Sequence, residues 1–328
     1  MANLIQRFDG LLLDLDGVVY EGGKAIPGAV ETINHLANQL KIGYVTNNAS
    51  RKPETIAAQL SGYGLNVAAD QVIGSARAAA QLLAEKISTD SKVLVVGGEG
   101  LRSEVERLGF TVVPSADDAP DAVIQGFSPE VGWKDLAQAA FAIQRGAIWV
   151  ASNQDWTIPV EGGIAPGNGT LVSAVHTAVG ILPDFAGKPA PKIFETALEQ
   201  LKLTNPLFVG DRLDTDSKGA RGFGIKSAIV LTGISSRKDL LAAKPDERPD
   251  FILQDLTQLL EAYPDSKQTK YGVKVEEVEV ELLNNKVRVV QGDPSSLSAL
   301  RAACEIIWNS PVPIYGLDVE PALYQEKK

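Results

Sequence analysis

Short apolar runs alternate with amphipathic segments along most of this chain. The first run, Leu11 to Leu13, precedes a segment with helical spacing from about Pro27 to Gln39, and the same rhythm continues to about residue 263. Unbroken apolar runs are typical of strands that are buried on both faces of a parallel sheet. Strands that alternate with helices in this way predict an α/β fold with a doubly wound, Rossmann-like parallel sheet. The further strands that we expect lie at residues 41–48, 91–98, 121–127, 147–153, 206–211 and 226–233.

The pattern changes at two places. Residues 160–169 are rich in loop-forming residues and predict an irregular boundary segment, after which the strand–helix rhythm returns. Near residue 270 the chain turns polar and then changes character, so residues 270–328 predict a small, separate α+β appendage.

The appendage carries its own strand and helix signals. Apolar and polar residues alternate around Asn284 and Asn285, which predicts a β-hairpin. Asp293 followed by Pro294 predicts the N-cap and first position of a helix. A short strand is expected within residues 311–319.

Composition narrows the class of protein. The 328 residues, 45% of them hydrophobic and 22% charged, predict a globular chain of roughly two or three domains. A net charge of −10 argues against nucleic acid or an anionic membrane as partner. The single cysteine, Cys304, excludes an internal disulfide and is typical of a reducing compartment. No apolar run reaches the roughly 18 residues of a membrane span, and the N-terminal segment lacks the apolar stretch of a signal peptide, so we expect a cytoplasmic protein.

Two carboxylates follow the first apolar run. Asp14 and Asp16 are one residue apart with Gly17 behind them, and strand alternation would place both side chains on the same side. Parallel α/β sheets bind their ligands at the carboxyl ends of strands. Like charges this close require a cation or a proton. Half of a metal site, an acid/base pair and a solvated turn are all compatible with the pair taken alone.

Polar residues follow two later segments in the same manner. Thr46, Asn47 and Asn48 close the strand at 41–48 and offer uncharged groups that suit an oxyanion, with a plain turn or N-cap as the alternative. Lys188 precedes Pro189, which excludes the α conformation for the lysine. The lysine could pair with a phosphate and a carboxylate at once, although a lone lysine is usually a solvated surface group.

Three further carboxylates follow the strand at 206–211. Asp211, Asp214 and Asp216 lie within six residues of the sequence, which packing alone does not explain. Oxygen ligands of this kind suit Mg²⁺, which takes protein carboxylates together with phosphate and water. An acidic surface loop is the alternative.

The ordered set DLDGVVY, TNN, KP and GDRLDTD resembles the four motifs of the haloacid dehalogenase superfamily phosphatases. The long interval between TNN and KP leaves room for an inserted α/β cap, as in the C2-capped, class IIA branch that acts on p-nitrophenyl phosphate, phosphoglycolate or glycerol 3-phosphate. The resemblance covers roughly residues 8–263. It implies a catalytic core in two parts, 1–77 and 184–263, a C2 cap at 78–183, and the appendage at 270–328.

This resemblance also implies a magnesium-dependent hydrolase of small phosphomonoesters. Asp14 would be the nucleophile that forms an aspartyl-phosphate, and Asp16 would be the general acid and then the general base. Thr46 and Lys188 would bind the transferring phosphoryl group, and Asn47 would lie near the substrate. Asn48 is a further candidate for substrate binding.

The metal ligands follow from the same resemblance. Mg²⁺ would be held by Asp14, by the backbone carbonyl of Asp16 and by Asp211. Asp216 would support the metal directly or through water, whereas the part played by Asp214 is left open.

Substrate choice is expected to come from the cap. Asn153 and Asp155 in ASNQDWTIP resemble the family's N-x-D segment and are candidates for the substrate-facing loop, with a turn cap as the alternative for Asp155. A buried aspartate there would favour an alcohol with hydroxyls, such as glycerol 3-phosphate, over phosphoglycolate. We further expect that a homodimer, if one forms, uses the cap or the appendage.

Several other functions share part of this set of motifs. A phosphoglycolate or sugar phosphatase of the same family is the nearest alternative. A phosphomutase is disfavoured by the cap position, and a dehalogenase by Asp16 together with the acidic segment at 211–216. A non-catalytic binding protein of the same fold would be expected to have lost at least one of the motif residues, and all of them are present.

Overall fold

The computed structural model describes residues 3–160 and 162–325. These residues form two compact units, one from Met1–Lys41 together with Asn205–Lys328 and the other from Ile42–Thr204. The four segments expected from the sequence have other boundaries, and that division stays a prediction. Each unit is described by itself.

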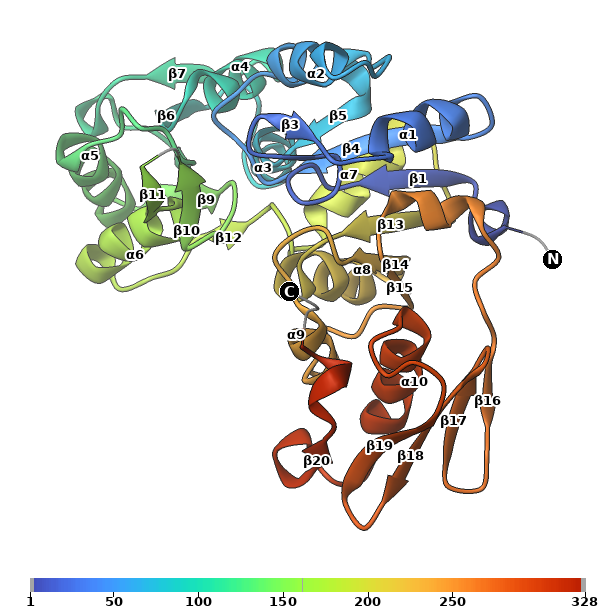
Figure 1. Ribbon diagram of the computed structural model, residues 1–328. Coiled ribbons are helices and arrows are strands. Elements are labelled where there is room, and N and C mark those ends of the chain that lie inside the picture. The colour runs from blue at the N-terminus through green and yellow to red at the C-terminus, as the bar shows by residue number, and fades with distance from the viewer. Residues whose placement is uncertain (1–2, 161, 326–328) are drawn as a thin grey trace. The chain divides into compact units, whose positions relative to one another are not determined.

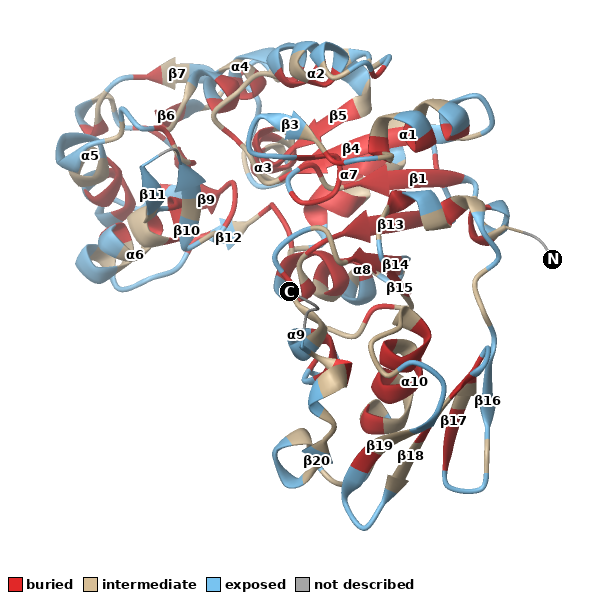
Figure 2. Cartoon of the chain, viewed as in Figure 1, coloured by how far each residue is buried: buried red, intermediate tan, exposed pale blue. Residues whose placement is uncertain are grey.

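The first unit contains a layer of parallel strands. Their spatial order is β15 (Phe251–Leu253), β14 (Lys226–Val230), β13 (Pro206–Gly210) and β1 (Gly10–Leu13). Leu11 of β1 lies opposite Leu207 of β13, and Leu13 lies opposite Val209. Every residue of β1 and β13 is buried, as Figure 2 shows, which confirms that their unbroken apolar runs form buried parallel strands. This part also contains α1 (Ala29–Ala37), α8 (Lys218–Phe223), α9 (Arg237–Leu241) and the hairpin of β2 (Tyr20–Glu21) with β3 (Lys24–Ala25), among other short elements.

The C-terminal part of the first unit is a second sheet with a helix, drawn in orange and red in Figure 1. Its strands are β16 (Ser266–Gln268), β17 (Gly272–Val275), β18 (Val278–Leu283), β19 (Lys286–Gln291) and β20 (Asp318–Val319), and its helix is α10 (Leu297–Trp308). The predicted hairpin is confirmed between β18 and β19. Asn284 and Asn285 have φ angles of 50° and 61°, the left-handed conformation that a two-residue hairpin turn requires. The short strand expected within 311–319 is confirmed by β20, which runs parallel to β19.

The helix begins later than its sequence signals predicted. Ser296, not Asp293, is the N-cap, and its Oγ accepts a hydrogen bond from the Ala299 N–H at 3.1 Å. The carboxylate of Asp293 instead accepts from the Ser295 N–H at 2.9 Å. An aspartate that binds the backbone two residues ahead forms a turn of its own, so the chain turns once more before the helix starts.

One hydrophobic core joins α10 and its sheet to β14, α9 and β15. Val280 and Leu300 of the C-terminal part share this core with Ile229, Leu240 and Ile252. All five side chains are 3% exposed or less. The C-terminal part therefore does not close its core alone.

The second unit contains the pair β4 (Lys41–Thr46) with β5 (Val72–Gly74) and a separate five-stranded parallel sheet. The order in that sheet is β12 (Asp184–Phe185), β9 (Ile148–Ala151), β8 (Ala122–Gln125), β6 (Lys92–Val96) and β7 (Thr111–Val113). The helices are α2 (Pro53–Gly62), α3 (Ser75–Ala84), α4 (Glu99–Arg107), α5 (Trp133–Gln144), α6 (Asn168–Val179) and α7 (Lys192–Leu201). Both units thus confirm the predicted α/β class with parallel strands.

The irregular segment expected at residues 160–169 is a wrong prediction in part. It lies across the antiparallel hairpin of β10 (Thr157–Val160) and β11 (Gly163–Pro166), and α6 begins at its end. The strands are short, largely exposed and contain two prolines, so they lack the alternation that identifies a half-buried strand. Along the described stretches of the chain, no helix is both long enough and apolar enough to cross a bilayer.

Candidate active site

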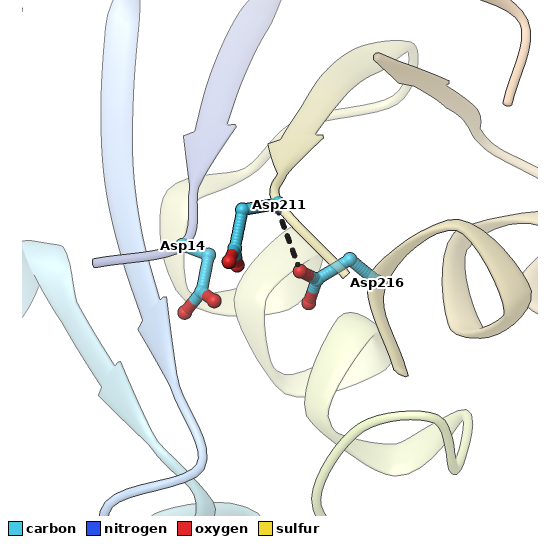
Figure 3. A group of neighbouring side chains, drawn as sticks. All are labelled: Asp14, Asp211 and Asp216. Atoms are coloured by element: carbon cyan, nitrogen blue, oxygen red, sulfur yellow. Dashed lines mark hydrogen bonds between the residues drawn. The ribbon is translucent and has the colours of Figure 1, made fainter. Parts of the chain in front are cut away.

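Three carboxylates of the first unit meet at the ends of neighbouring strands. The side chains of Asp14, Asp211 and Asp216 each place an oxygen within 4.8 Å of the others, and we call them the acidic cluster (Figure 3). Asp14 follows β1 and Asp211 follows β13, and the Asp14 N–H donates to the Val209 carbonyl at 2.9 Å. Asp216 comes from a single π-helical turn, Leu213–Ser217, a form that is frequent at functional sites.

Backbone N–H groups hold the two buried carboxylates in place. Oδ2 of Asp216 accepts from the N–H groups of Asp211 and Arg212, at 3.1 and 3.0 Å. Oδ2 of Asp211 accepts from the Ile234 N–H at 2.7 Å. The exposed fractions of Asp211 and Asp216 are 2% and 0%. Three carboxylates so close, two of them buried, are stable only beside a compensating cation or with a proton bound, and their hard oxygen donors fit Mg²⁺.

Three glycines leave the space that these carboxylates occupy. A Cβ at Gly233 would lie 2.1 Å from Oδ2 of Asp211, and one at Gly17 would lie 2.5 Å from the same atom. Gly17 also has a φ of +75°, which favours glycine. A Cβ at Gly210 would lie 2.3 Å from Oδ2 of Asp216. Any larger residue at these positions would displace a carboxylate.

Asp16 and Asp214 lie outside the acidic cluster. Asp16 is exposed, and its Oδ2 accepts from the hydroxyl of Tyr20 at 3.3 Å. Asp214 accepts from Nε and Nη2 of Arg212 at 3.1 and 2.8 Å. Burial opposes ionisation of Asp214, but the hydrogen bonds and charge of Arg212 outweigh it and hold the pKa of Asp214 below its usual value. Of the two later aspartates in GDRLDTD, Asp216 therefore lies with Asp14 in the acidic cluster, whereas Asp214 binds the side chain of Arg212.

The expected phosphate-binding residues lie in the second unit. Thr46 ends β4 with 6% of its surface exposed, and Lys188, between β12 and α7, is 2% exposed. A lysine buried to this extent is not a solvated surface group. Asn48 serves a local turn, since its Oδ1 accepts from the Ser50 N–H at 3.1 Å and from the Arg51 N–H at 3.2 Å.

The two residues expected in the cap, Asn153 and Asp155, form hydrogen bonds with Asn47 of the TNN motif. Asp155 accepts hydrogen bonds from the side chain of Asn47, and the side chain of Asn153 donates to the Asn47 carbonyl. Asn153 is 4% exposed. The structure thus brings three of the four residues expected to bind substrate, Asn47, Asn153 and Asp155, into one group.

Sequence reasoning missed several residues that shape the first unit's site. Tyr20 binds the carboxylate of Asp16, and the Thr232 hydroxyl donates to the Gly17 carbonyl at 2.6 Å. The Ser235 Oγ accepts from the Leu213 N–H at 3.1 Å, which fixes the start of the π-helical turn. The sequence offered one signal for Thr232 and Ser235: the polar segment TGISS follows the apolar strand β14, just as polar residues follow the other strands of the site.

Comparison with known proteins identifies the family. A model of haloacid dehalogenase-like hydrolases matches residues 11–111, and a second HAD-hydrolase-like model matches residues 185–259. A D-glycerol 3-phosphate phosphatase of Mycobacterium tuberculosis is 41% identical over 317 residues, which are 94% of this chain and 88% of that protein. This chain belongs to the haloacid dehalogenase-like hydrolases. The resemblance drawn from the four motifs is confirmed.

Two further relatives of this hydrolase differ in how much of the chain they match. An acid sugar phosphatase of Staphylococcus saprophyticus is 35% identical over 259 residues, covering 78% of this chain and 98% of that protein. A crystal structure of a glycerol phosphate phosphatase from Mycobacterium tuberculosis, in complex with magnesium, matches with a TM-score of 0.87 and 38% identity. That match covers 98% of this chain and 96% of the other. Similarity to the glycerol phosphate phosphatase therefore extends over nearly the whole hydrolase.

Proposed function

We propose that this hydrolase is a magnesium-dependent phosphatase of small phosphomonoesters and that its substrate is glycerol 3-phosphate. The acidic cluster carries the proposal, because three carboxylates within 4.8 Å of one another, two of them directly after β1 and β13, would form a site for a hard cation beside a nucleophile. Similarity to a glycerol 3-phosphate phosphatase over 94% of the chain supports the substrate, since the sugar phosphatase match covers only 78%.

The proposed reaction has two displacements at phosphorus. A carboxylate oxygen of Asp14 attacks the phosphorus, the bond to the alcohol oxygen breaks, and an aspartyl-phosphate forms. Asp16 donates its proton to the leaving alcohol. Asp16 then removes a proton from water, and the water oxygen attacks the phosphorus. The bond between the Asp14 oxygen and phosphorus breaks, which frees inorganic phosphate and restores the Asp14 carboxylate.

The other predicted site residues would stabilise the negative charge of the phosphoryl group. The ammonium group of Lys188 and the hydroxyl of Thr46 would bind the phosphoryl oxygens, whose negative charge otherwise repels the carboxylate of Asp14. Asp14, Asp211 and Asp216, with the main-chain carbonyl of Asp16, would hold Mg²⁺. When bound, Mg²⁺ neutralises charge shared between the carboxylates and the phosphate.

The composition of the chain bears on its cellular compartment and on the kind of substrate it acts on. One cysteine and a net charge of −10 support a cytoplasmic enzyme that acts on a small metabolite rather than on nucleic acid. A homodimer through the cap or the appendage stays a prediction.

Phosphate release from a substrate panel tests the proposal. The panel contains glycerol 3-phosphate, phosphoglycolate, sugar phosphates and nucleotides, each with and without Mg²⁺. We expect the highest kcat/KM with glycerol 3-phosphate and no turnover after chelation. No release from any substrate with Mg²⁺ present would refute the enzyme assignment, and isomerisation of a sugar phosphate without release would favour a mutase.

A further inference from the structure

Asn47 is the centre of a hydrogen-bond junction that joins distant segments of the second unit. Its Nδ2 donates to both carboxylate oxygens of Asp155, at 3.1 Å each, and to the main-chain carbonyl of Lys188 at 3.0 Å. Its own carbonyl accepts from Oγ of Ser75 at 2.6 Å and from Nδ2 of Asn153 at 2.7 Å. The junction ties the N-x-D turn and the lysine segment to the end of β4.

The partners of Asn47 determine how its amide is turned. The Asp155 carboxylate and the Lys188 carbonyl can only accept hydrogen bonds, so the amide nitrogen must face both of them. Both N–H bonds of this nitrogen are then used, one toward each segment. A reversed amide would place its oxygen against two acceptors.

The N-x-D turn is itself fixed from a second side. The Asn168 Nδ2 donates to the Asn153 carbonyl at 2.8 Å, and the Asp155 N–H donates to Oδ1 of Asn153 at 3.2 Å. The Gly169 N–H donates to the Asp155 carbonyl at 2.9 Å. Asp155 therefore meets Asn47 from a turn anchored to the start of α6.

The backbone just before the lysine packs closely against Ser152 and Asn47. The Gly187 N–H donates to the Ser152 carbonyl at 2.7 Å. A Cβ at Gly187 would lie 2.5 Å from that oxygen and 2.7 Å from Oδ1 of Asn47. Displacement of Asn47 would therefore shift the main chain that carries Lys188.

We propose that Asp155 and Asn47 are positioning residues for Lys188. The Asp155 carboxylate fixes the Asn47 amide, and the amide fixes the main chain of the lysine that binds the transferring phosphoryl group. This inference rests on the proposed function and deepens it. Asp155 acts on the phosphoryl step that every substrate shares, and not on the alcohol that leaves.

Two substrates with different leaving groups separate these roles. The alcohol of p-nitrophenyl phosphate has no further hydroxyl, whereas that of glycerol 3-phosphate has hydroxyls for a carboxylate to bind. We expect Asp155→Ala to lower kcat about tenfold with both substrates, the size of one lost hydrogen bond to a charged group. Asp155→Asn keeps an acceptor for Asn47 and should retain more activity than Asp155→Ala. A loss confined to glycerol 3-phosphate, or no loss, would overturn the inference.

A double variant and a neighbouring control complete the kinetic test. If Asp155 acts through Asn47, Asn47→Ala combined with Asp155→Ala should be no slower than Asn47→Ala alone. Additive losses would mean independent roles. Gln154→Ala removes an exposed side chain from the same turn and should leave both substrates unaffected.

Hydrogen exchange gives a readout that does not depend on turnover. Asp155→Ala should speed amide exchange in residues 185–190 several-fold, whereas Gln154→Ala should not. Unchanged exchange there would overturn the inference. Failure of the wild-type protein to release phosphate from either substrate would refute the proposed function, and exchange would then decide the role of Asp155 by itself.

Discussion

Substitution of Gly233 tests whether the precise placement of Asp211 matters to this hydrolase. A Cβ at Gly233 would lie 2.1 Å from Oδ2 and 2.5 Å from Cγ of Asp211. Since non-bonded heavy atoms are most stable at about 3.5 Å, the carboxylate must retreat by about 1.0 to 1.4 Å in Gly233→Ala. Its hydrogen bond from the Ile234 N–H, 2.7 Å long, would be distorted by the same movement.

A displacement of this size has a predictable effect. A misplacement of about 1 Å in an active site can cost about 100-fold in rate, which corresponds to about 2.7 kcal/mol of transition-state stabilisation. Crowding of a packed site costs a further 1 to 3 kcal/mol of folding free energy, roughly. We therefore expect Gly233→Ala to be folded and about 100-fold slower. It should also require a higher Mg²⁺ concentration to reach half of its maximal rate.

The assay measures phosphate release from p-nitrophenyl phosphate over a range of Mg²⁺ concentrations, together with thermal unfolding with and without Mg²⁺. Gly222→Ala is the matched control, because a Cβ at this position in α8 meets nothing within 4 Å. Alanine in a helix is more stable than glycine by up to about 1 kcal/mol, so this control should lose nothing. Wild-type kcat and Mg²⁺ dependence in Gly233→Ala would refute the assignment of Asp211 to the metal site.

Four further predictions follow from the same geometry. Asp14→Asn should abolish turnover while the unfolding temperature changes little, and retained activity would remove Asp14 as nucleophile. Arg237→Met should lower the free energy of unfolding by roughly 2 to 4 kcal/mol in urea titration, because its guanidinium donates to three backbone carbonyls, whereas Lys238→Met should have no effect. Burial raises the pKa of the Cys304 thiol, so iodoacetamide should label it only after unfolding, and stability should fall as the pH rises above about 8.5, where the unfolded thiol ionises. Deletion of residues 270–328 should yield an unfolded or aggregated protein, and a soluble, active product would contradict the shared core.

Much of the acidic cluster could be predicted from the sequence. Asp14 and Asp211 each follow an unbroken apolar run, and carboxyl ends of parallel strands meet at one edge of a sheet. The resemblance to the family favoured Asp216 over Asp214, whereas local spacing could not separate them, because the two lie in one irregular π-helical turn whose geometry no spacing rule describes. The arginine that binds Asp214 is two residues away and gives no directional signal.

The group around Asn47 lay beyond sequence reasoning for a different reason. Asp155 is separated from Asn47 by 108 positions, and their contact depends on how two segments pack. A local pattern identifies N-x-D as a turn but does not reveal what the aspartate faces. The residues were predicted as candidates, whereas their partners required the structure.

The C-terminal part was expected to be separable, and the structure connects it to the site instead. The segment that begins at Gly233 supports Asp211 through the Ile234 N–H, and three residues later it enters α9 with Arg237. The Arg237 guanidinium donates to the carbonyls of Ser295 and Leu323 in the C-terminal part, at 2.8 and 3.1 Å. Leu240 and Leu241 of α9 lie in the same hydrophobic core as α10, so α9 links the C-terminal part to the segment that holds Asp211. The C-terminal part therefore supports the segment that holds the carboxylate of Asp211.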